Sequence, residues 1–128
     1  MNKSIRIGGA SGFWGDSYRA TEQLLQDTTL DFIVYDYLAE ITMSIMARAR
    51  AKSPSAGYAT DFIDAVIKPY IKRISTHNTR LISNAGGVNP EKCAEGLSEL
   101  VTDLQRTLHV SCITGEALLG SARAIKPG

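Results

Sequence analysis

SIRIGGASGFWGD, residues 4–16, is the stretch of this sequence that decides the fold class. Its first part, residues 4–8, is a short apolar run bounded by glycines, which is typical of a buried strand. A glycine-rich loop follows, and the spacing of apolar residues from Asp16 to about Gln26 predicts a helix. A strand that leads through a glycine loop into a helix indicates an α/β fold.

The same alternation continues along the chain. Three further strands are expected at residues 32–37, 80–83 and 109–114, and further helices at residues 40–52, from Thr60 with a kink at Pro69, and from Pro90 to about Leu108. Short apolar strands between amphipathic helices indicate a mainly parallel sheet that helices cover on both faces. We therefore predict an α/β fold with a mainly parallel four-stranded sheet flanked by helices, as a single domain over residues 1–128.

The end of the sequence adds two expectations. The pattern after Gly115 allows one more helical turn, and the sequence stops soon after the fourth expected strand. Four strands suit either an open doubly wound sheet or the first half of a barrel. We expect the chain to be a truncated part of a larger α/β domain.

Composition and charge argue against several classes of protein. The chain is 44% hydrophobic and 21% charged, and its net charge is +1. A charge this small creates no strong electrostatic field that would attract nucleic acid or a membrane surface. No stretch approaches the length of a membrane span, and the first nine residues lack the apolar run of a signal peptide. Cys93 and Cys112 form no zinc-ligand pattern, so both are interpreted as small buried hydrophobes. We expect a cytoplasmic protein without a metal, nucleic-acid or membrane partner.

The glycine loop is the first candidate ligand-binding segment. Ligands of parallel α/β sheets bind beyond the carboxyl ends of the strands, where loops converge and helix amino termini point. Gly9 and Gly12 would let backbone amides approach an anion, and Ser11 offers a hydroxyl. Asp16 belongs to this group as a helix cap rather than as an acid catalyst, and Trp14 is either a lid or a hydrophobic plug. The alternative is a tight turn that needs glycine and binds nothing.

Asp36 and Glu40, in the stretch DYLAE at the end of the second expected strand, are the catalytic candidates. Two carboxylates at the crevice could act as acid and base or hold a metal ion. The alternative is that Glu40 merely supports the start of a helix and Asp36 caps it.

The third candidate segment, SNAGGVNP, follows the third expected strand. The carboxamide of Asn84 could orient a polar ligand, and Gly86 and Gly87 allow close approach of the backbone. Asn89 is expected to cap the helix that begins at Pro90.

These segments resemble a known family. IRIGGASGFWGD, DFIVYDYLAE, SPSAGY and RLISNAGGVNPEKCAEGL, in this order, are similar to the acyclic terpene utilisation (AtuA-type) family and cover nearly all of the chain up to about Leu100. Family members are longer, so the resemblance implies that this is an N-terminal portion. The positions that match the family's motifs are Gly9, Gly12, Asp16, Glu40, Asn84, Gly86 and Gly87.

The resemblance implies a bacterial protein that acts in the breakdown of acyclic terpenes such as citronellol and geraniol, a route that runs through acyl-CoA thioesters. A small-molecule metabolite, such as a CoA thioester, is then the expected partner, and no cofactor is assigned. Glycine-loop amides would hold its anionic group, Asn84 would orient a polar group, and Asp36 or Glu40 would act as acid or base.

Two other interpretations stay open. GASGFWG is similar to the glycine loop of NAD(P)-binding short-chain dehydrogenases, and Asp36 follows Gly15 at about the ribose-binding spacing. Against this, residues 40–75 are expected to be helical where that fold has another strand, and no Tyr-x-x-x-Lys pair occurs. The third interpretation is a non-catalytic fragment that assembles, for example as a homo-oligomer, because an unfinished sheet leaves an unpaired edge.

Overall fold

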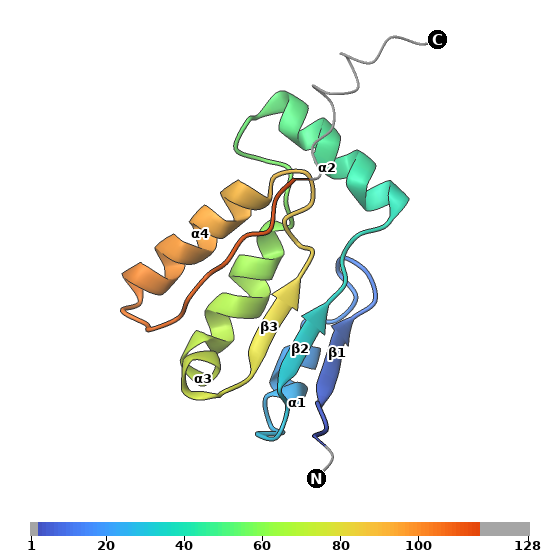
Figure 1. Ribbon diagram of the computed structural model, residues 1–128. Coiled ribbons are helices and arrows are strands. Elements are labelled where there is room, and N and C mark those ends of the chain that lie inside the picture. The colour runs from blue at the N-terminus through green and yellow to red at the C-terminus, as the bar shows by residue number, and fades with distance from the viewer. Residues whose placement is uncertain (1–2, 116–128) are drawn as a thin grey trace.

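The structure is a computed structural model, and it describes residues 3–115. Strands and helices alternate as the sequence predicts (Figure 1). The elements are β1 (Ile7–Ser11), α1 (Ala20–Leu24), β2 (Phe32–Tyr35), α2 (Glu40–Lys52), η1 (Phe62–Ile67), η2 (Lys68–Tyr70), α3 (Ile71–Thr76), β3 (Arg80–Ser83) and α4 (Pro90–Asp103).

The strands form one parallel sheet in the order β1-β2-β3. Within residues 3–115 each new strand is added on the same side of the previous one, so the strand order does not reverse. Because the connections between parallel strands are right-handed, connections that all run in the same direction across the sheet place their helices on the same face. In Figure 1, α1 lies behind the sheet, and no helix crosses the face turned to the viewer. The expectation of helices on both faces is therefore wrong for the described part of the chain, because that arrangement needs a reversal of strand order.

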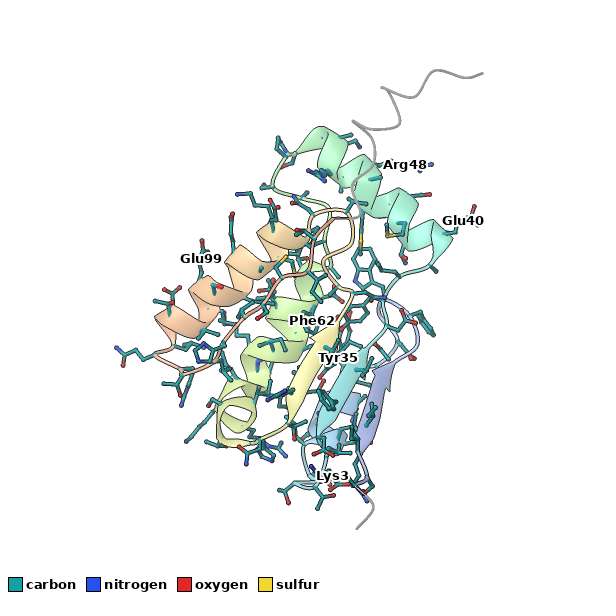
Figure 2. All side chains as sticks on the ribbon, in the orientation of Figure 1. Lys3, Tyr35, Glu40, Arg48, Phe62 and Glu99 are labelled. Atoms are coloured by element: carbon teal, nitrogen blue, oxygen red, sulfur yellow. The ribbon has the colours of Figure 1, made fainter. Side chains whose placement is uncertain are left out.

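The core lies between the sheet and the helices that cover its one face. Ile33 and Tyr35 of β2 are buried there, and the Tyr35 ring packs edge-on against Phe62 with ring centroids 5.2 Å apart (Figure 2). Val66 and Leu25, both almost fully buried, complete the centre of this layer. The alternate residues of the strands point to the other face, which we call the open face.

β1 begins three residues later than the sequence analysis expected, at Ile7 instead of Ser4. The buried positions of β1 are Gly8 and Ala10. A methyl group at Gly8 would lie 3.0 Å from Leu24 Cδ2, so a small residue is needed where α1 packs on the strand. The larger side chain of Ile7 faces the opposite way and is exposed.

The expected fourth strand is wrong. Residues 104–115 follow α4 without pairing to the sheet and run beside that helix (Figure 1). Leu108 and Val110 pack against the core, whereas Ile113 is 87% exposed. Residues 109–114 (HVSCIT) mix polar and apolar side chains, so they lack the continuous apolar run of a strand buried on both faces. Cys112 is consequently exposed, contrary to expectation, while Cys93 is buried as predicted.

The helical run after Thr60 is broken into three pieces, as the position of Pro69 suggested. A π-helical turn, η1, leads into the 3-10 turn η2, and only then does α3 begin at Ile71. Proline removes a helical hydrogen-bond donor, and wider and tighter turns on either side accommodate that loss. No helix in the described residues is long and apolar enough to cross a membrane. The helical turn expected after Gly115 lies outside the described residues.

Candidate functional site

The ends of the three strands meet at the carboxyl edge of the sheet, and hydrogen bonds link them. The side-chain oxygen Oδ1 of Asn84, after β3, accepts a 2.8 Å hydrogen bond from the backbone N–H of Tyr37, after β2. Nδ2 of Asn84 donates to Oδ1 of Asp36 at 2.8 Å. The Ser11 hydroxyl at the end of β1 donates to the backbone oxygen of Asp36 at 3.3 Å. Ser11, Asp36 and Asn84 are thus brought together.

Asp36 and Asn84 are exposed although they are hydrogen-bonded to each other. The carboxamide fixes the direction of one carboxylate oxygen, and the backbone that follows β2 fixes the carboxamide. A carboxylate held in one orientation and open to solvent can accept a hydrogen bond from a ligand or exchange a proton with it. This pair is the polar centre of the candidate site.

The glycine loop is tied down by its own aspartate. The N–H of Gly12 donates to Oδ2 of Asp16 at 2.9 Å, and the Asp16 N–H donates to the backbone oxygen of Phe13. The expected helix start at Asp16 is wrong, because α1 begins at Ala20 and its N-cap is Arg19. Asp16 therefore closes the loop instead of capping the helix. Its carboxylate accepts the hydrogen bond of the Gly12 amide, which was predicted to bind the anion of a ligand.

Gly86 and Gly87 are required by packing inside the protein. A methyl group at Gly87 would overlap Met46 Sδ and lie 2.7 Å from the backbone oxygen of Gly57, and φ is +56°. At Gly86 it would lie 2.8 Å from Pro90. Both glycines let other parts of the protein approach closely, so packing alone explains why a residue without a side chain is needed at each position.

Asn89 lies at the N-cap position of α4, as expected, but its side chain does not cap the helix. Its Nδ2 donates instead to the backbone oxygens of Pro54 and Ala56, at 3.0 and 2.8 Å. Asn89 therefore holds the loop between α2 and η1 against the start of α4.

Glu40 is not part of the linked group. It is the first residue of α2, it is exposed, and Figure 2 shows its side chain at the outer end of that helix. The side chain that stabilises this helix start is Thr42, whose hydroxyl oxygen accepts from the Ala39 N–H at 2.6 Å. Gly9 lies in β1 on the open face, with nothing within 4 Å of an added methyl group.

A second carboxylate centre, Asp61, was missed by the sequence analysis. Its two side-chain oxygens accept hydrogen bonds from Trp14 Nε1 at 2.5 Å and from the Tyr18 hydroxyl at 3.2 Å. Trp14 is half-buried and packs against the core, so it fastens the glycine loop to the start of η1 and acts as a plug more than a lid. A lone tryptophan N–H in a loop needs an acceptor, and that need is the signal that could have led to Asp61.

Asp61 also influences the nearby phenols. Its negative charge raises the pKa of Tyr18, with smaller contributions from burial and from the hydrogen bond. Burial raises the pKa of Tyr37, and the charge of Asp61 adds to this effect. Both phenols therefore stay neutral and can act as hydrogen-bond donors at ordinary pH.

A hollow of about 610 Å³ lies elsewhere, along α4 and the segment that follows it. Its lining consists of Glu91, Ala94, Glu95, Ser98, Glu99 and Cys112. None of the predicted site residues lines it. Within residues 3–115, no three His, Cys, Asp or Glu side chains gather as they would to hold a metal ion.

No curated protein and no solved structure matches the chain significantly. One family model, described as "Acyclic terpene utilisation family protein AtuA", matches residues 5–127, which include every strand and helix of the structure. The chain therefore belongs to the AtuA family of acyclic terpene utilisation proteins.

Proposed function

We propose that the protein binds a metabolite of acyclic terpene breakdown, an acyl-CoA thioester or a related anion, at the carboxyl edge of the sheet. The family supports the class of metabolite. We infer the place of binding from the two hydrogen bonds of Asn84, one with the backbone of Tyr37 and one with the carboxylate of Asp36. It joins two strand ends and leaves a fixed carboxylate in contact with solvent.

In this proposal Asn84 and Asp36 have different tasks. Asn84 orients the carboxylate and can share its carboxamide with a carbonyl group of the ligand. Asp36 acts as acid or base, because it is the exposed carboxylate bonded to that carboxamide. Glu40 makes no hydrogen bond to this pair within residues 3–115, so we assign it no step.

The anionic group of the ligand is assigned to the glycine loop. The Gly12 amide already binds a carboxylate, that of Asp16, which supports the view that this loop can hold an anion. An external phosphate or carboxylate would have to replace Asp16 there. Gly9 and Ser11, the neighbouring positions of β1, are included in the proposed binding surface.

The proposal can be tested by titration with Trp14 fluorescence, because Trp14 is the only tryptophan and lies on this loop. We expect saturable quenching by the CoA thioester of a branched ten-carbon acid, weaker quenching by free CoA, and none by NADH. Saturation by NADH alone would instead support the dehydrogenase alternative.

Variants locate the site. Asn84→Ala should weaken binding of the thioester by about tenfold or more, the effect of losing one to two hydrogen bonds to a polar group. Asn78→Ala, at an exposed asparagine before β3, is the matched control and should leave binding unchanged. Equal affinity of the Asn84 variant and the control would rule out the proposed centre.

A further inference from the structure

The open face of the sheet is apolar and carries no helix in the described part of the chain. Ile7 of β1 is 62% exposed and Ile82 of β3 is 53% exposed. Phe32 and Val34 of β2 lie between them, and both are only half-buried. On the opposite face of the same strands Ile33 is fully buried. An exposed apolar sheet face of this kind is typical of surfaces that bind another surface.

Charge is distributed unevenly along this face. Arg80 begins β3 at the amino edge, alternates with Leu81 onto the open face, and forms no ion pair within residues 3–115. Asp36 follows β2 at the carboxyl edge and is exposed. Val34 and Ile82, which are partners in the sheet register, lie between these two charges. The face therefore has a positive end, an apolar middle and a negative end.

We propose that the open face binds the open face of a second copy of this chain, with the strands of the two copies antiparallel. A two-fold axis that lies between the two faces, and runs across the strands at the level of Val34 and Ile82, brings these residues of one copy against those of the other. The same rotation places Arg80 of each copy beside Asp36 of the other, so that opposite charges meet at both ends. Sheets pack face to face in such aligned arrangements at about 10 Å separation.

The size of the face sets the expected strength. Three short strands cover less than the roughly 800 Å² per partner of a typical stable interface. The dimer should therefore be weak, with a dissociation constant on the order of micromolar, and its charge pairs should decide the orientation. Both proposals use Asp36, so association is measured without any ligand, and its outcome does not depend on the proposed metabolite.

Sedimentation velocity of the full chain over a range of concentrations, at low salt, is the test. We expect a shift from monomer to dimer with rising concentration. Arg80→Glu should weaken the dimer about tenfold or more, because the new carboxylate would face Asp36 of the other copy, and Asp36→Arg should do the same. An equimolar mixture of the two single variants should associate again, and so should the double variant, because the charges are then complementary.

Arg48→Glu on α2, the exposed arginine labelled in Figure 2, is the control of equal charge change and should leave association unchanged. Circular dichroism checks that each variant is folded, and the mixing experiment needs no assumption about either single variant. A monomer at every concentration would overturn the proposal. The open face would then have to be covered by another part of the chain or by another protein. A dimer that Arg80→Glu does not weaken would also overturn it, and would indicate pairing through another surface, such as a strand edge or the exposed Ile41 and Ile45 of α2.

Discussion

At the scale of single residues, the candidate site depends on side chains that bridge two segments. Asn84 was expected to orient a ligand, and its contacts show that it also holds the end of β2. Asp61 was not expected at all, yet it receives two hydrogen bonds from the glycine loop and the residues that follow it. Such contacts join residues more than 40 positions apart, so no local pattern reveals them.

Asn84→Ala should lower the free energy of unfolding by about 1–3 kcal/mol, because the Tyr37 N–H and the Asp36 carboxylate both lose a partner. Urea unfolding measures this change. Asn78→Ala should change stability by less than about 0.5 kcal/mol, since it is an exposed position. Equal stability of both variants would mean that the bridge does not form in solution.

Asp61→Asn should lower the pKa of Tyr18 toward the ordinary value of a phenol. The negative charge of Asp61 disfavours the phenolate, so removing that charge makes deprotonation easier. A pH titration by NMR of ring-labelled tyrosine, with the signal assigned through Tyr18→Phe, measures the shift. Asp64→Asn, an exposed carboxylate about one turn further along, should leave the Tyr18 titration where it is.

At the scale of elements, the sequence predicted the bounds of some strands and helices correctly and missed others. β3 and α2 have the predicted bounds, and α4 begins at Pro90 as expected. β1 was displaced because Ile5 and Ile7 were assumed to be buried, whereas both are exposed and the small residues Gly8 and Ala10 face the helices. Hydrophobicity alone cannot tell which face of a strand is covered.

Gly87→Ala should be the most damaging of the glycine substitutions in the predicted site. The new methyl group would meet Met46 of α2 and the Gly57 backbone, at a positive φ, so we expect a loss of about 2 kcal/mol or more. Gly9→Ala is the matched control, with open space around the methyl group and less than about 0.5 kcal/mol expected. Thermal or urea unfolding of both variants would show the difference, and similar stabilities would contradict the packing of α2 on this turn.

At the scale of the whole molecule, the main error was the expectation of a fourth strand and of helices on both faces. Amphipathic helices indicate that a sheet is covered but not on which side, because the side is fixed by strand order. With the order β1-β2-β3, the helices that pack on the sheet lie on one face only in the described part of the chain, and α2 lies beyond the carboxyl ends of the strands (Figure 1). The sequence did predict that Asp36 and Asn84 share one edge, since parallel strands end together.

The two faces of the sheet should respond differently to truncation of side chains. Ile33→Ala, at a fully buried position, should lower the free energy of unfolding by about 2–5 kcal/mol. Ile82→Ala, on the open face, should cost less than about 1 kcal/mol when the protein is dilute enough to be monomeric. Equal losses in the two variants would show that the open face is covered within the monomer.

The contrast between Cys93 and Cys112 gives the molecule one reactive thiol. Burial raises the pKa of the Cys93 thiol to about 11, with a smaller contribution from Cys112, so at neutral pH almost none of it is thiolate. Cys112 is exposed beside α4. A maleimide should therefore label the native chain once and quickly, and a second time only on unfolding. A fluorophore or spin label at Cys112 would then report on the segment after α4 without any mutation.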